Sequence, residues 1–72
     1  MIVVHRLTHP DAPLYLNPDQ IQMIEGNPDT VLTLVNGSKF VVGETPDDVT
    51  GLIRQWRASI LSQALAPQLR VV

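Results

Sequence analysis

The histidines are the first residues in this chain whose type and spacing could serve metal or acid–base chemistry. His5 and His9 lie four residues apart, and the chain contains no cysteine. A zinc site needs at least three protein ligands, and no third residue of matching spacing accompanies these two. His5 could pair with Asp11 or Glu25 as a base and its orienting acid, but no Ser or Cys nucleophile accompanies such a pair. The pattern predicts neither a metal site nor a catalytic site.

The remaining candidate groups have structural explanations. Asp47 and Asp48 form a carboxylate pair at the start of an expected helix, where acidic side chains complement the helix dipole. The glycines do not have the spacing of a phosphate-binding loop: they are Gly26, Gly37, Gly43 and Gly51. We therefore expect no enzyme activity and no cofactor.

Charge and hydropathy exclude two further classes. The formal net charge is −2, with a single lysine, Lys39, and four scattered arginines, whereas nucleic-acid surfaces need clustered basic residues. The apolar runs are far shorter than the roughly 20 residues that span a bilayer. The first residues are apolar and then basic, the reverse of a secretory signal peptide. We expect a cytoplasmic protein that neither inserts stably in a membrane nor binds nucleic acid.

The length of 72 residues allows one domain. A chain this short buries only about 60% of the surface that its unfolded form exposes. Small proteins usually add disulfides, a metal or oligomerisation, and the first two are not available here. We therefore expect a homo-oligomer, or docking on a partner.

Short strands followed by one helix account for the whole chain. Residues 2–7 are rich in β-branched side chains, which favours a strand, whereas the prolines within residues 8–13 predict a loop. Residues 20–25 alternate imperfectly, so a turn of helix is an alternative there. The expected strands are residues 2–7, 14–16, 20–25, 30–35 and 38–42.

The Asn36-Gly37 pair predicts a hairpin with a two-residue type I′ turn, in which both central residues have positive φ. This turn sets Val35 opposite Ser38. This register predicts that both faces of the hairpin are apolar. One helix can cover only one of them, so the other face must meet the N-terminal strands or another chain. One face would carry Val31, Val35, Phe40 and Val42, and the other Leu32, Leu34 and Val41.

A helix is predicted over residues 46–65. Thr45 suits the N-cap, Pro46 the first helical position, and Pro67 should end the helix. At about 1.5 Å per residue the helix would span roughly 30 Å, longer than a five-residue strand of about 17 Å, so its last turn should project beyond the sheet. Its apolar stripe comprises Val49, Leu52, Ile53, Trp56, Ile60, Leu61 and Ala64.

These elements predict an α+β fold in one domain over residues 1–66, with a flexible tail over 67–72. The sheet is small, antiparallel and rolled or partly barrel-like, with four to five short strands and one C-terminal amphipathic helix. Trp56 can either anchor the helix in the core or contact a partner protein. Arg54 and Arg57, which flank it, can either face the solvent or form the polar rim of an apolar contact. The candidate interaction residues are Trp56, Ile60, Leu61, Leu65, Arg54, Arg57, Leu32, Leu34 and Val41.

Several segments resemble the flagellar and swarming motility proteins of the FlbD (SwrD) family, over roughly residues 1–62. The resemblance implies a flagellar accessory protein without enzyme activity or cofactor, associated with motor power, with motor or stator components as partners near the flagellar base. The loop at residues 9–13 is more proline-rich than in the family, and the C-terminal end has fewer lysines. The matching segments are Met1-Ile2-Val3-Val4-His5-Arg6-Leu7, Leu16-Asn17-Pro18-Asp19-Gln20-Ile21, Ile24-Glu25, the run from Pro28 to Val42, and Glu44-Thr45-Pro46-Asp47-Asp48-Val49.

The order of the predicted elements also suggests a second class of function. A hairpin followed by a helix resembles the end of LytTR-type DNA-binding domains, and the strand-rich body resembles the carbon storage regulator family. Both need basic residues that this chain lacks. A small nucleic-acid-binding regulator is therefore the alternative.

Overall fold

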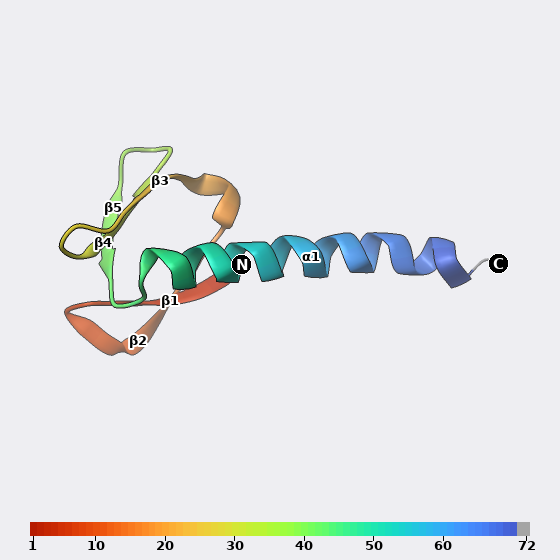
Figure 1. The fold of residues 1–72 in the computed structure, drawn as a ribbon, viewed down its shortest axis with the longest axis horizontal. Coiled ribbons are helices and arrows are strands. Elements are labelled where there is room, and N and C mark those ends of the chain that lie inside the picture. The colour runs from red at the N-terminus through yellow and green to blue at the C-terminus, as the bar shows by residue number, and fades with distance from the viewer. Residues whose placement is uncertain (71–72) are drawn as a thin grey trace.

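The computed structural model describes the backbone of residues 1–70 and the side chains of residues 1–64. Within that part of the chain, five strands form one antiparallel sheet and a C-terminal helix follows (Figure 1). The strand order is β2-β1-β5-β4-β3, and the sheet is not closed into a barrel. The expected α+β fold is confirmed. The elements are β1 (Ile2–Arg6), β2 (His9–Leu16), the 3-10 turn η1 (Pro18–Gln20), β3 (Ile21–Glu25), β4 (Thr30–Leu34), β5 (Lys39–Val42) and α1 (Pro46–Arg70).

The sheet consists of two parts joined by a short seam. β1 pairs with β2, and β3 to β5 form the second part; the two meet where Arg6 of β1 lies opposite Val42 of β5. The Leu7 amide donates to the Val41 carbonyl at 3.0 Å, and the Gly43 amide donates to the His5 carbonyl at 2.8 Å. Because the seam is short, the parts can lie at an angle, and Figure 1 shows β1 and β2 running across the direction of β4 and β5.

The second strand is longer than the sequence predicted. β2 begins at His9, so the loop expected over residues 8–13 is wrong for most of its length. β2 is an edge strand, where proline is tolerated. Pro13 lies opposite His5, whose amide and carbonyl bond to groups on the other side of β1. Pro13 has no backbone N–H, and at this position none is needed to bond with β1. The strand therefore accommodates the proline.

The hairpin register is shifted by one residue from the predicted one. Leu32 lies opposite Phe40, the Leu34 amide donates to the Ser38 carbonyl at 2.8 Å, and the Gly37 amide donates to the Leu34 carbonyl at 2.9 Å. Among the described residues positive φ occurs only at Gly37, at 91°, so Asn36 does not adopt the type I′ conformation. The loop spans residues 35–37, a turn followed by a left-handed glycine, which is another common hairpin connection.

The shifted register exchanges the faces of side chains, as a one-residue slip must. Leu32, Leu34 and Phe40 share the inner face, and Val41 points outward with Val31. The predicted face of Leu32, Leu34 and Val41 is therefore wrong. The outer face also carries Thr33 and Lys39 and is less apolar than expected.

The core lies between the inner face of the sheet and the first turns of α1. Val49 of the helix is fully buried, as are Val4 and Leu32 of the sheet. Burying such a side chain stabilises the fold by about 1.5–3 kcal/mol. The buried residues are Ile2, Val4, Leu16, Leu32, Val42 and Val49, against which Leu14, Ile21, Ile24, Leu34, Phe40, Leu52, Ile53 and Trp56 pack.

The helix starts as expected and ends later. The Asp48 amide donates to Thr45 Oγ1 at 3.1 Å, and the Thr45 amide donates to Asp48 Oδ2 at 3.3 Å, a reciprocal cap. At the other end α1 passes through Pro67 to Arg70, so the predicted end at residue 65 is wrong. A proline disfavours the helical conformation of the residue before it. This makes a helix end common at that point but does not require one. Residues 71–72 of the expected tail lie outside the described part.

Candidate interaction surface

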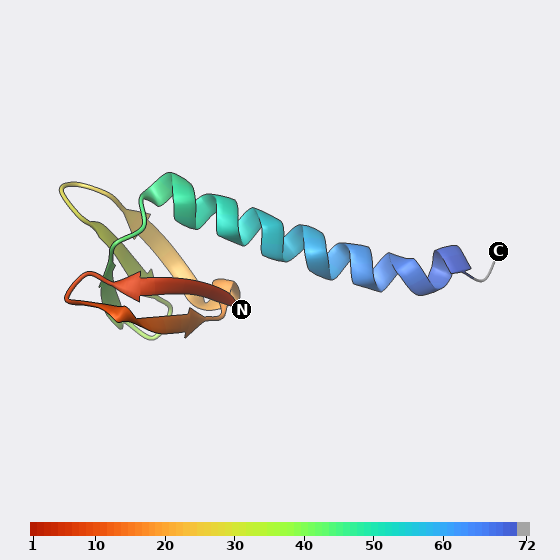
Figure 2. The same cartoon turned by 90° about the horizontal axis from the view of Figure 1, so that it is seen from below.

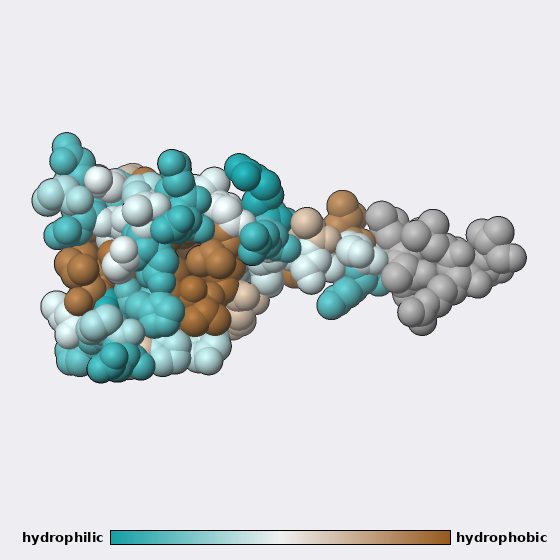
Figure 3. Space-filling view, turned by 60° about the horizontal axis from the view of Figure 1, so that its bottom comes forward, coloured by the Kyte–Doolittle hydropathy of each residue, from teal (hydrophilic) through white to brown (hydrophobic). Residues whose placement is uncertain are grey.

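The helix leaves the body of the molecule just after Trp56. Trp56 still packs against the core cluster, whereas Ile60 is 46% exposed and Leu61 is 61% exposed. Figures 1 and 2 show α1 continuing well beyond the sheet, and the molecule measures 50 × 25 × 18 Å. We call residues 57–64 the projecting segment. Figure 3 shows hydrophobic side chains on the helix where it leaves the body.

A shallow groove lies between η1 and the part of α1 where the projecting segment begins. Its volume is about 360 Å³, and Trp56, Ile60 and Ala64 line it along the helix. Asp19 contributes from η1, which is positioned by the hydrogen bond from the Asp19 amide to Asn17 Oδ1 at 3.0 Å. The groove therefore combines an apolar helix face with one carboxylate from a distant part of the chain.

An exposed ion pair borders this groove. Arg57 Nη2 lies 3.5 Å from Asp19 Oδ1, and the two side chains are 62% and 59% exposed. The Arg57 guanidinium carbon also lies 5.9 Å from the centre of the Trp56 ring. Solvent screens such a pair, and exposed pairs contribute about 0–1 kcal/mol. Arg57 and Asp19 are thus free to exchange this contact for one with another molecule.

The structure brings together some of the predicted interaction residues and separates others. Trp56, Arg57, Ile60 and Leu61 meet at the groove. Arg54 is exposed on the helix but does not line the groove, and the Leu65 side chain lies outside the described residues.

On the hairpin, the predicted residues are not part of one surface. Leu32 is in the core, Leu34 packs against it, and Val41 is 41% exposed on the outer face of the sheet. Asp19 was missed as a groove residue, because its turn is separated from the helix in sequence and no local pattern links them. Sequence reasoning also missed the exposed Met23 and Tyr15 side chains of β3 and β2.

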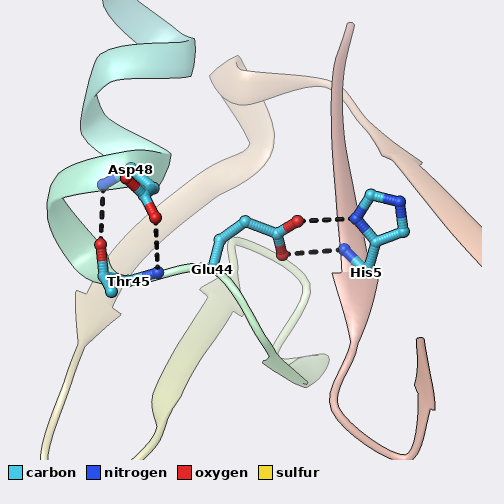
Figure 4. Close-up of polar contacts among 4 residues, drawn as sticks. All are labelled: His5, Glu44, Thr45 and Asp48. Carbon is cyan, nitrogen blue, oxygen red and sulfur yellow. Dashed lines mark hydrogen bonds and ion pairs between the residues drawn. The ribbon is translucent and has the colours of Figure 1, made fainter.

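His5 does not line this groove and has a structural role elsewhere in the fold. Its ring Nδ1 lies 2.7 Å from Glu44 Oε2, and its backbone amide donates to Glu44 Oε1 at 2.9 Å (Figure 4). Burial raises the pKa of Glu44, but the hydrogen bonds from His5 outweigh it, so that the pKa falls below its ordinary value of 4.5. This carboxylate ties β1 to the start of α1.

The described residues offer no arrangement for metal chemistry. No group of three or more His, Cys, Asp or Glu side chains that could hold a metal ion occurs among them. None of the helices in that part of the chain has the length and apolar character to cross a membrane.

Comparison with known proteins identifies the family. No curated protein and no solved structure matches the chain. The model of the FlbD family, described as flagellar and swarming motility proteins, matches residues 1–61. The match covers every strand and the helix up to the projecting Leu61, and it agrees with the segments that carried the sequence resemblance. The chain belongs to the FlbD family of flagellar and swarming motility proteins.

Proposed function

We propose that this protein is a non-enzymatic accessory of flagellar motility that acts by binding another protein through its projecting segment. Its partner is a component of the flagellar motor or stator, and the contact supports motor power during swarming. It acts in the cytoplasm at the flagellar base. Family membership supports the motility setting. The exposure of Ile60 and Leu61 supports the mode of action.

The projecting segment suits protein binding because it exposes the apolar side chains of Ile60 and Leu61 and because the helix before it packs on the core. Val49 is fully buried four residues after the cap, and Trp56 packs on the core, so the helix direction is set by the sheet. Exposed apolar side chains on a small protein mark contact sites. Burial of Ile60 and Leu61 by a partner would contribute about 1.5–3 kcal/mol each.

Self-association through the same segment is part of the proposal. Two copies that pack their projecting helices would bury the groove residues Trp56, Ile60 and Ala64 on both sides. We expect light scattering to give a mass above that of the monomer. The measurement is made at ~100 µM, because association is favoured at high protein concentration. A strictly monomeric mass would refute self-association, and the proposed function would then consist of the partner contact alone.

The test replaces the apolar pair with charge. In Ile60→Asp with Leu61→Asp, swimming and swarming should fall strongly while filaments still assemble. The matched control is Ser59→Asp with Ser62→Asp, which adds the same charge at exposed neighbouring positions of the same helix. Thermal unfolding of both purified variants must stay close to that of the original protein. Normal motility in the variant with both Ile60→Asp and Leu61→Asp would refute the proposal.

A further inference from the structure

Among the described residues, the edge of β1 that faces away from β2 is paired with another strand only at Arg6. The His5 amide and carbonyl point away from β2, since they bond to Glu44 Oε1 and to the Gly43 amide. Successive residues of a strand direct their backbone groups to opposite edges, so the Val3 amide and carbonyl point the same way as those of His5. β5 pairs with β1 only at Arg6. No strand of the described chain therefore lies opposite Val3 on this edge.

A groove lies beside this open edge. Its volume is about 460 Å³, and it runs between Val3 of β1 and the first turns of α1. Figure 4 shows Glu44 reaching across from the start of the helix to β1. Among the described side chains, no lysine or arginine lines the groove; besides Val3, the residues that matter here are Glu44, Asp47, Asp48, Gly51 and Leu52.

Gly51 is a feature that packing within the chain does not explain. A glycine inside a helix costs about 1 kcal/mol relative to alanine. A Cβ at Gly51 would meet no atom within 4 Å, so the fold does not require glycine there. At Gly26, by contrast, a Cβ would collide with the ring of Pro46. The bare backbone at Gly51 leaves the groove wall open beside Val3.

We propose that this groove binds an extended, basic segment of a partner protein, which adds as a strand to the edge of β1 at Val3. Main-chain hydrogen bonds to a free edge provide affinity in this mode of recognition, and side-chain contacts provide specificity. Glu44 and Asp48 already accept hydrogen bonds from His5 and Thr45, whereas Asp47 is exposed at the groove. The three carboxylates select lysine or arginine in the bound segment. The projecting segment is not part of this site, so the two proposals stand separately.

The test uses a capped peptide of alternating lysine and valine as the probe and the full chain as the receptor. The peptide should bind, and the Val3 amide should shift in the nitrogen–proton NMR spectrum and exchange more slowly with solvent. A peptide with glutamate in place of lysine should not bind, and added salt should weaken binding of the lysine peptide. Equal binding of both peptides, or an unprotected Val3 amide, would overturn the proposal.

Gly51→Leu tests the groove directly. A Cβ at Gly51 would meet no atom within 4 Å, and leucine is a better helix former than glycine, so the variant should fold while the added side chain lowers peptide affinity at least tenfold. Thr50→Leu adds bulk at the neighbouring exposed helix position, which does not line the groove, and should bind normally. Asp47→Lys is the second variant and should also weaken binding. Retained affinity in either groove variant refutes the site, and a change of oligomeric mass in Gly51→Leu would assign the edge to a second copy instead.

Discussion

The attachment of α1 to the sheet depends on its first turns, and Val49→Ala tests this dependence. Val49 is fully buried, whereas Ile60 on the same helix is 46% exposed. Removing two buried methyl groups from Val49 loses about 1.6 kcal/mol at ~0.8 kcal/mol per group. The cavity left behind adds to this loss, which brings the expected destabilisation to about 2–3 kcal/mol.

The matched substitution Ile60→Ala removes more carbon atoms from a less buried position. We expect it to cost less than about 1 kcal/mol in the isolated protein, because only part of its surface is withdrawn from water. The contrast in burial, not the size of the side chain, therefore sets the order of the two effects.

Urea unfolding followed by far-ultraviolet circular dichroism measures both free energies, and Trp56 fluorescence provides a second probe of the same transition. For a domain of this size 1 kcal/mol corresponds to roughly 4–8 °C in melting temperature, so Val49→Ala should melt about 10–20 °C lower. If Ile60→Ala proves the more destabilising change in a monomeric sample, the helix is not anchored as described.

The remaining predictions concern a charge pair and two glycines. Because the pKa of Glu44 is lowered by folding, its interaction with His5 stabilises the protein above about pH 4.5 and this contribution is lost as the pH falls through the lower folded pKa. The difference in urea midpoint between the original protein and Glu44→Gln should therefore shrink on acidification, and a constant difference would contradict the assignment. Gly37→Ala should destabilise by about 1–2 kcal/mol because Gly37 has φ of 91°, whereas Gly51→Ala should stabilise by about 0.5–1 kcal/mol; urea titrations of the two variants should move in opposite directions.

Much of the fold was predictable because its signals are local. The helix start depends on Thr45, Pro46 and Asp48 within a few residues, and the reciprocal cap forms as such a segment favours. Four of the five strands lie within one residue of their predicted bounds. The α+β class followed from these local patterns without knowledge of any long-range contact.

The candidate interaction surface was predictable only in part. The projection of α1 followed from comparing helix and strand lengths, and the exposure of Ile60 and Leu61 agrees with it. The contribution of Asp19 could not be predicted, since η1 and the helix meet only in the folded protein. The free edge at Val3 depends on the strand order, which determines that β5 reaches β1 only at Arg6.

The sequence by itself determined the order of short strands and helix, the helix cap, and the apolar stripe that runs on past Trp56, because neighbouring residues set these through backbone propensity and periodicity. Tertiary structure decided the extent of β2, where Pro13 is tolerated because its partner His5 bonds elsewhere. It also decided the hairpin register. The Asn36-Gly37 pair is compatible with two loop lengths, and pairing Leu32 with Phe40 on the covered face gives the loop in which Gly37 alone takes positive φ.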